Sequence, residues 1–367
     1  MSFGARALIR LGAITHNLKV IRDTTPGARV MAVIKANAYG HGMVPVAGQL
    51  GDADCLAVAR LPEALELRES GIDKPITLLS GVFGADELQA AGANRLELVV
   101  HCQEQLELIE THLDHAITLW LKIDTGMNRL GFEPRQAGEV IARLRAANPA
   151  GKLCLMTHFA DADNLEGPLT ADQFQRIAEV VDGFDGDVSV ANSAAMLGWP
   201  DIADARSTLK FDGRLWVRPG IAIYGISPFA ETTAADLGLK PVMQFEARLI
   251  ARKRLNAGSQ VGYKGRYVSD ADTWLGIIAA GYGDGYSRHF ADGTPVLING
   301  RRVPLIGNVS MDMIAVDLGA DSTDVVGDVA TLWGDGLPVE EVAPWAGAIP
   351  YELVCGVMNR EPSKIIA

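Results

Sequence analysis

The sequence lacks the features of several classes of protein. No apolar run of about 18 residues or more occurs among its 367 residues, so we expect no transmembrane helix. Its first ten residues contain no apolar stretch long enough for a secretion signal. Basic residues are outnumbered by acidic ones, so the formal net charge is -12 at pH 7. An acidic surface repels nucleic acid and anionic membranes, so we expect neither as a partner.

Cysteine is scarce as well. The four cysteines, Cys55, Cys102, Cys154 and Cys355, have the spacing of neither a zinc site nor a redox pair. Cys55 and Cys154 lie within apolar runs, so we expect them to be small core residues. The seven histidines form no ligand pattern such as H-x-x-x-H. We therefore expect no metal site and a reducing compartment, the cytoplasm.

What the chain does contain is a regular alternation of apolar runs and helical patterns. Ile14–Ile21 has the apolar spacing of a helix, which Thr15 or Asn17 could cap. Eight strand-length runs follow, most of them separated by helical patterns such as Pro62–Glu69. This order predicts an α/β fold, a (β/α)8 TIM barrel over residues 1–230. The eight runs are Val30–Ile34, Cys55–Ala59, Ile76–Leu79, Leu96–Val100, Ile117–Ile123, Leu153–Met156, Val188–Ala191 and Leu215–Val217.

The pattern changes after about Pro228. Strand-like runs such as Val242–Ala251, Trp274–Ala280 and Met313–Leu318 follow without comparable helices between them. The pair Asn299-Gly300 separates two short apolar runs, which is a strong signal for a β-hairpin. Residues 231–367 are therefore predicted to form a mainly β C-terminal domain.

A lysine ends the first apolar run of the barrel. Lys35 follows Val30–Ile34 directly, and the glycines around His41 predict a turn that leads into a helix. In a barrel, the carboxyl ends of the strands build the active site. Burial against an apolar wall would lower the pKa of Lys35 and make its amine nucleophilic, as a Schiff-base lysine requires. The alternative is an ordinary solvated surface charge.

Nine segments, in order along nearly the whole chain, resemble the bacterial alanine racemases. These proteins are pyridoxal 5′-phosphate (PLP) enzymes with an N-terminal (β/α)8 barrel and a C-terminal β domain. The resemblance implies interconversion of L- and D-alanine, which supplies D-alanine for cell-wall peptidoglycan or serves alanine catabolism. The segments are Ala32–Gly42, Trp120–Gly131, Thr157–Phe159, Asn192–Ala194, Val217–Ile221, Val261–Tyr263, Gly281–Gly285, Ser310–Met313 and Pro350–Leu353.

The resemblance implies two catalytic residues. Lys35 carries PLP as a Schiff base and exchanges the Cα proton on the D face, and Tyr263 acts on the L face. A phenol with an ordinary pKa of about 10 needs a neighbouring cation to act as a base. In the family this tyrosine comes from the partner subunit, which implies a homodimer with shared active sites. Taken without the resemblance, Tyr263 would be a surface tyrosine on a strand.

By the same resemblance, Arg218 faces the pyridine nitrogen. A guanidinium stays protonated and hydrogen-bonds the nitrogen without giving up its proton, which favours racemisation over transamination. The alternative for Arg218 is a surface strand end, and His158, placed beside the ring, could equally be a core residue. The other residues matched to cofactor binding, mostly around the phosphate, are Tyr39, Asn192, Ser193, Gly220, Ile221 and Tyr351.

Substrate binding is also implied by resemblance. Arg129 matches the arginine that holds the substrate carboxylate, for which a planar guanidinium is well suited. Lys122 matches a lysine that is carbamylated in many members; the alternatives are a Lys122–Asp124 pair or a bound anion. Tyr282 and Met311, with the adjacent Asp312, match residues at the substrate entrance. Two other functions stay open: a broad-specificity or serine racemase on the same fold, and a PLP-binding protein without turnover.

Overall fold

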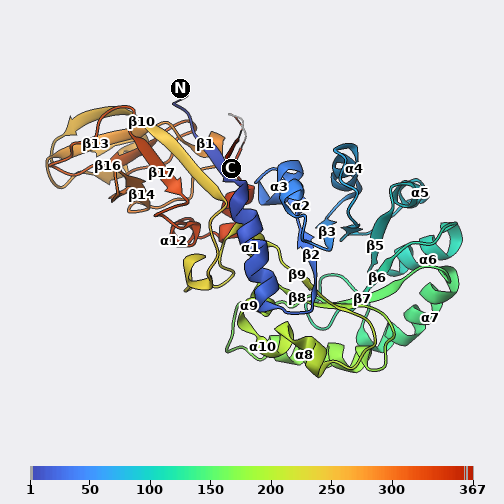
Figure 1. Cartoon of the computed structure of the whole chain (residues 1–367). Coiled ribbons are helices and arrows are strands. Elements are labelled where there is room, and N and C mark those ends of the chain that lie inside the picture. Colours follow the sequence, from blue (N-terminus) through green and yellow to red (C-terminus); the bar gives the residue numbers. More distant parts are fainter. Residues whose placement is uncertain (1–2, 359, 361–362, 367) are drawn as a thin grey trace.

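The computed structural model describes residues 3–358, 360 and 363–366. Figure 1 shows a barrel to one side and a β-rich part to the other, with α1 (Leu11–Thr24) between them. Eight parallel strands close the barrel, because the last, β9, pairs with the first, β2. The predicted barrel is confirmed, and each of the eight apolar runs overlaps a strand with ends that differ by at most two residues. The strands are β2 (Arg29–Val33), β3 (Cys55–Val58), β4 (Ile76–Leu78), β5 (Leu96–Val100), β6 (Leu119–Lys122), β7 (Leu153–Met156), β8 (Val188–Asn192) and β9 (Leu215–Arg218).

Helices cover the outside of the barrel and follow the strands in turn (Figure 1). The prediction of a cap by Thr15 or Asn17 was wrong, since α1 begins four or more residues earlier. Asn17 is instead buried and bonds the Ile223 carbonyl and both backbone groups of Lys240. Besides α1, the helices of the barrel part are α2 (Lys35–Tyr39), α3 (Met43–Gln49), α4 (Leu61–Glu69), α5 (Ala85–Ala93), α6 (Gln103–His112), α7 (Ala137–Ala147), α8 (Leu169–Val181), α9 (Ser193–Gly198), α10 (Pro200–Ala203) and α11 (Ala205–Thr208).

The second part is built on a sheet with the order β15-β14-β17-β10-β1-β18, to which β13 and β16 are attached beside β10. The Asn299-Gly300 hairpin is confirmed: both residues have positive φ, and the flanking strands pair antiparallel. The strands are β10 (Met243–Leu255), β13 (Thr273–Ile278), β14 (Pro295–Ile298), β15 (Arg301–Pro304), β16 (Ile314–Asp317), β17 (Val329–Trp333) and β18 (Lys364–Ile366), with β11 (Gln260–Val261) and β12 (Tyr267–Val268) as a separate pair. The helices α12 (Val339–Val342) and α13 (Pro350–Cys355) follow β17.

Strand β1 (Arg6–Arg10) is a feature that no pattern in the sequence indicated. It pairs antiparallel with β10 and parallel with β18, so the first strand of the chain lies in the second sheet. Arg6 and Glu246 lie opposite each other and form an ion pair of 2.7 Å. The chain therefore enters through the β-rich part before it builds the barrel.

One continuous apolar core extends through both parts. Inside the barrel, Trp120 and Trp216 meet edge to face at 5.6 Å, and their indole N–H groups donate to Glu97 and Asp187. Cys55 and Cys154 are buried, as predicted. Among the described residues, no helix is long and apolar enough to cross a membrane, and no group of three potential metal ligands occurs.

Candidate active site

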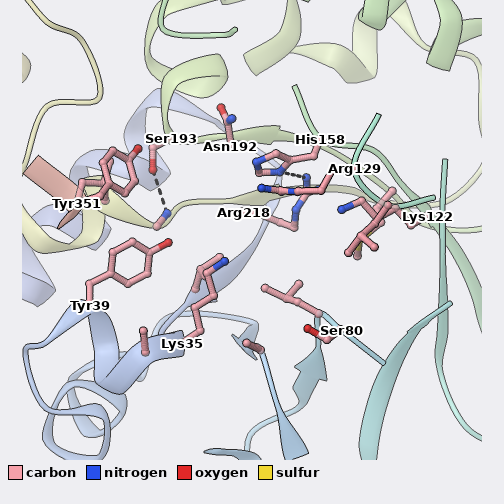
Figure 2. A pocket seen from close by; sticks show the side chains of 18 of the residues that line it. Lys35, Tyr39, Ser80, Lys122, Arg129, His158, Asn192, Ser193, Arg218 and Tyr351 are labelled. Atoms are coloured by element: carbon pink, nitrogen blue, oxygen red, sulfur yellow. Dashed lines mark hydrogen bonds between the residues drawn. The ribbon is translucent and has the colours of Figure 1, made fainter. Parts of the chain in front are cut away.

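A cavity of about 400 Å³ lies at the carboxyl ends of the barrel strands (Figure 2). Four cationic side chains line it: Lys35, Lys122, Arg129 and Arg218. No aspartate or glutamate is among the described residues that line it. Helix α13 of the β-rich part contributes Tyr351 and Cys355, so both parts of the chain form the wall. Such a charge balance favours an anionic ligand.

Lys35 lies just beyond the carboxyl end of β2, as predicted, separated from it by Ile34 alone, and points into the cavity (Figure 2). Burial is the main cause that lowers the pKa of its amine, and the positive charge of Arg129 lowers it further. Glu63 and Cys355 oppose this shift without cancelling it. The predicted direction of the Lys35 pKa is therefore confirmed, and the amine is more nucleophilic than that of a surface lysine.

Arg218 is buried at the end of β9, and its partners in the described part of the chain are all neutral. Nη1 donates to Ser189 Oγ at 2.6 Å, and Nη2 donates to the Thr157 carbonyl. Burial lowers the pKa of Arg218 to about 10, so the guanidinium stays protonated at neutral pH. The alternative prediction of a surface strand end is wrong.

His158 lies beside Arg218, with its Nδ1 3.5 Å from the arginine Nη2. Burial and then the charge of Arg218 hold the pKa of His158 well below its ordinary value. The imidazole is therefore neutral and can accept from the guanidinium with Nδ1. It lines the cavity and is not a core residue.

Lys122, at the end of β6, faces the other cations. Burial, followed by the charges of Arg218 and Arg129, lowers the pKa of Lys122 to about 8. The alternative Lys122–Asp124 pair does not form among the described residues, because Asp124 Oδ1 instead accepts from the backbone N–H groups of Gly126 and Asn128, each at 3.0 Å. Asp124 still offsets the Lys122 charge in part, but its effect on the Lys122 pKa is smaller than that of each neighbouring cation.

A cradle for a small anion occupies the opposite end of the cavity. Ser193 Oγ accepts from the backbone N–H groups of Gly220 and Ala222 at 2.9 and 3.3 Å. The hydroxyls of Tyr39 and Tyr351 face this point (Figure 2), and their rings lie 6.1 Å apart. A Cβ at Gly220 would come within 2.7 Å of the Tyr39 hydroxyl oxygen, so a side chain there would fill the cradle.

The remaining cavity residues include matched and unanticipated ones. Asn192 caps α9 by accepting from the backbone N–H of Ala195, and Ile221 continues the wall after Gly220. Ser80 and Thr157 also line the cavity, although the sequence analysis did not single them out. Each directly follows a barrel strand run, so their position at a strand end was the signal that could have found them.

The structure does not bring the other predicted residues into this cavity. Tyr263 is 66% exposed and lies in a short 3-10 turn, so the alternative of a strand tyrosine is wrong. Tyr282 and Met311 are both exposed. Their segments lie side by side, because the backbone N–H of Tyr282 donates to the Ser310 carbonyl at 3.0 Å and that of Gly283 donates to the Met311 carbonyl. Asp312 pairs with Arg360 at 2.8 Å. In a single chain, the predicted site residues therefore form two separate groups. One group lines the cavity, and the other, Tyr263, Tyr282, Met311 and Asp312, lies outside it in the β-rich part.

Together, the fold and the cavity define a barrel protein with a cationic pocket that contains a lysine of lowered pKa. Two family models match the chain: alanine racemase, N-terminal domain, over residues 9–228, and alanine racemase, C-terminal domain, over residues 242–365. The alanine racemase of Aeromonas hydrophila is 49% identical over 97% of this chain and 98% of its own length, and that of Vibrio cholerae is 47% identical over 97% and 96%.

The solved structures agree with the sequence comparisons. The biosynthetic alanine racemase from Pseudomonas aeruginosa superimposes over the full length of both chains with a TM-score of 0.93 and 42% identity. The alanine racemase from Acinetobacter baumannii does so with a TM-score of 0.91 and 37% identity. The chain belongs to the alanine racemase family and is an isomerase. The resemblance found in the sequence is confirmed.

Proposed function

We propose that the chain interconverts L-alanine and D-alanine with PLP as its cofactor. The proposal rests on the cavity, because Lys35 and Arg218 both line it and none of its described lining residues is a carboxylate. The relatives' names support alanine as the substrate. When bound, PLP withdraws electrons from the amino acid and makes its Cα proton acidic.

The residues present fit the cofactor. A phosphate suits the cradle of Ser193, Tyr39 and Tyr351 with the backbone amide at Ile221, and the absence of a side chain at Gly220 leaves room for it. Lys35 would hold the aldehyde carbon, and Arg218 would donate to the ring nitrogen. An acidic residue in place of Arg218 would give the ring a proton, whereas a guanidinium with neutral partners keeps its own.

Racemisation requires proton exchange on both faces of Cα. The Lys35 amine takes or returns the proton on the D face, since the lowered pKa leaves more of it neutral. Tyr263 of a second copy of the chain serves the L face. Arg129 holds the substrate carboxylate. In each turnover, one face of Cα loses a proton and the opposite face receives one.

The exposed residues of the β-rich part support a homodimer with shared active sites. Tyr263, Tyr282 and Met311 are apolar or aromatic and large, yet each is more than a third exposed in the single chain. A second copy that covers them would bury apolar surface and supply the missing half of each site. We further propose a domain boundary near residue 230, and cytoplasmic action, which four free cysteines support.

Circular dichroism of the purified chain with PLP tests the proposal. L-Alanine should lose its ellipticity towards zero, much faster than L-serine in a parallel sample. Equal rates would favour a broad-specificity racemase, and no change with either amino acid would favour a binding protein without turnover. Lys35→Ala should remove the visible absorbance of bound cofactor; if the absorbance persists, Lys35 does not carry it.

A further inference from the structure

The backbone after Lys35 adopts the left-handed helical conformation, which L-amino acids disfavour. Four consecutive residues, Ala36, Asn37, Ala38 and Tyr39, have φ between 52° and 54°, so α2 is a left-handed turn without a glycine. This conformation costs roughly 1–2 kcal/mol per residue. A turn of this kind persists only when its surroundings determine it, and such strain gathers at functional sites.

Several hydrogen bonds fix the later part of the turn. The Ala38 N–H donates to the Ile34 carbonyl at 2.9 Å, and the Asn37 side-chain oxygen accepts from the Met43 N–H at 2.8 Å. The buried His41 stacks on Tyr224 and bonds the carbonyls of Ala38 and Tyr39 through Nδ1. At Ala36, the residue that directly follows Lys35, the carbonyl accepts from the Gly40 N–H at 3.1 Å, but none of these bonds holds the Ala36 N–H group.

Glu63 holds that residue. Its Oε1 accepts from the backbone N–H of Ala36 at 2.7 Å. Its Oε2 accepts from the N–H groups of Ala59 and Arg60 at 2.8 and 2.9 Å. A single carboxylate at the start of α4 therefore ties the end of β3 to the first residue of the left-handed turn. Glu63 lies outside the cavity lining, so it reaches Lys35 through the backbone.

Glu63 is also the one carboxylate among the charges that act on Lys35 in the described structure. The charged or titratable groups that face the lysine are Arg129, Lys122, His158, Glu63 and Cys355. Burial and Arg129 lower the pKa of Lys35, and Glu63 raises it. Removal of the Glu63 charge would therefore let the Lys35 pKa fall further.

We propose that Glu63 is the positioning residue of Lys35: it anchors the left-handed turn through the Ala36 N–H and supplies the negative charge that balances Arg129. This inference rests on the proposed function, in which the Lys35 amine captures PLP. The reacting group itself stays Lys35, and Glu63 touches neither cofactor nor substrate.

Glu63→Gln tests both parts of this role in the full chain. The variant loses the charge and presents an amide N–H₂ group to a backbone N–H. Glu66→Gln is the matched control, because Glu66 lies on the same helix, is exposed, and has no side-chain partner among the described residues. The readout is the rate at which cofactor-free chain captures added PLP, followed by visible absorbance across pH.

In Glu63→Gln, capture at the high-pH plateau should slow about tenfold, because the amine is misplaced. The midpoint of its pH dependence should move to lower pH, because the neutral amine then persists to lower pH. Glu66→Gln should change neither quantity. A role in fold stability alone would lower the plateau and leave the midpoint in place, which would overturn the inference. Unchanged capture in Glu63→Gln would overturn it as well.

Glu63→Asp separates position from charge and serves if Glu63→Gln fails to fold. Its carboxylate is one methylene shorter, so it cannot keep all three backbone bonds. Capture should slow while the midpoint stays at the wild-type pH, and wild-type capture would contradict the inference. Borohydride reduction of the wild-type chain in the presence of PLP distinguishes the two proposals, because it fixes the cofactor covalently on the lysine that carries it. If no reduced cofactor is found on Lys35, the proposed function fails, whatever the variants do.

Discussion

Lys122 provides the sharpest test of the cavity's charge balance. It lies among three other cations and no carboxylate pairs with it in the described structure. We predict that it takes up carbon dioxide as a carbamate, which replaces a positive charge by a negative one. The new anion would then offset Arg129 and Arg218 and hold Arg129 in place for a substrate carboxylate.

The magnitude follows from the pKa of about 8. Only the neutral amine reacts with carbon dioxide. At pH 7, about one Lys122 amine in ten is neutral, whereas an amine at the ordinary value of 10.5 is neutral about once in three thousand. The fraction of reactive amine at this pH is therefore about 300-fold higher for Lys122 than for an amine of ordinary pKa. Uptake by Lys122 should rise with pH and level off above about 8.

Isotopically labelled bicarbonate and nuclear magnetic resonance of the intact chain provide the assay. The wild type should show one carbamate signal that Lys122→Ala removes and Lys152→Ala keeps. Added acetate should partly restore the activity of Lys122→Ala, because a small carboxylate can replace the carbamate. A signal that survives Lys122→Ala, or uptake that rises only near pH 10, would refute the reasoning.

Three further predictions concern other parts of the site. Tyr263→Phe should slow Cα proton exchange from L-alanine far more than from D-alanine, and equal loss in isotope-exchange assays would contradict the assignment of faces. Gly220→Ala should weaken PLP binding at least tenfold by titration, because its Cβ meets the Tyr39 hydroxyl, whereas Gly48→Ala, with nothing within 4 Å, should bind normally. Gln173→Leu should cost about 2–4 kcal/mol in denaturant unfolding, because it removes the partner of three hydrogen-bonding groups, of which Thr125 is buried; a loss below 1 kcal/mol would show that water replaces the lost bonds.

The barrel was predictable because its strands are buried on both faces and therefore form continuous apolar runs. All eight runs overlap a strand, and Asn299-Gly300 specified its hairpin through residues that tolerate positive φ. Five of the described strands escaped prediction: β1, β11, β12, β17 and β18. β1 is five residues long and runs straight into α1 without a turn signal, and its partner β10 lies more than 230 residues away. β17 is equally short.

The site was predictable in part. Chemistry and position at a strand end identified Lys35, whereas the resemblance pointed to Arg218 and supplied roles that stay predictions. The left-handed turn after Lys35 could not be predicted, because three of its four residues have side chains that avoid this conformation and only tertiary contacts stabilise it. The contact of Glu63 with Ala36 could not be predicted either, because it is a tertiary contact. In the sequence, Glu63 is only one of several acidic residues on a helix.

The position of β1 has a consequence for synthesis of the chain on the ribosome. Domains generally fold as they emerge, N-terminal part first, at about 5–20 residues per second. β1 emerges first, but its antiparallel neighbour β10 begins only at Met243. The barrel strands, which end at Arg218, can therefore close while β1 still presents unpaired backbone groups. β1 therefore waits about 12–50 seconds of translation for β10, and during roughly the last 1–5 seconds of this interval its open strand edge lies next to a complete set of barrel strands.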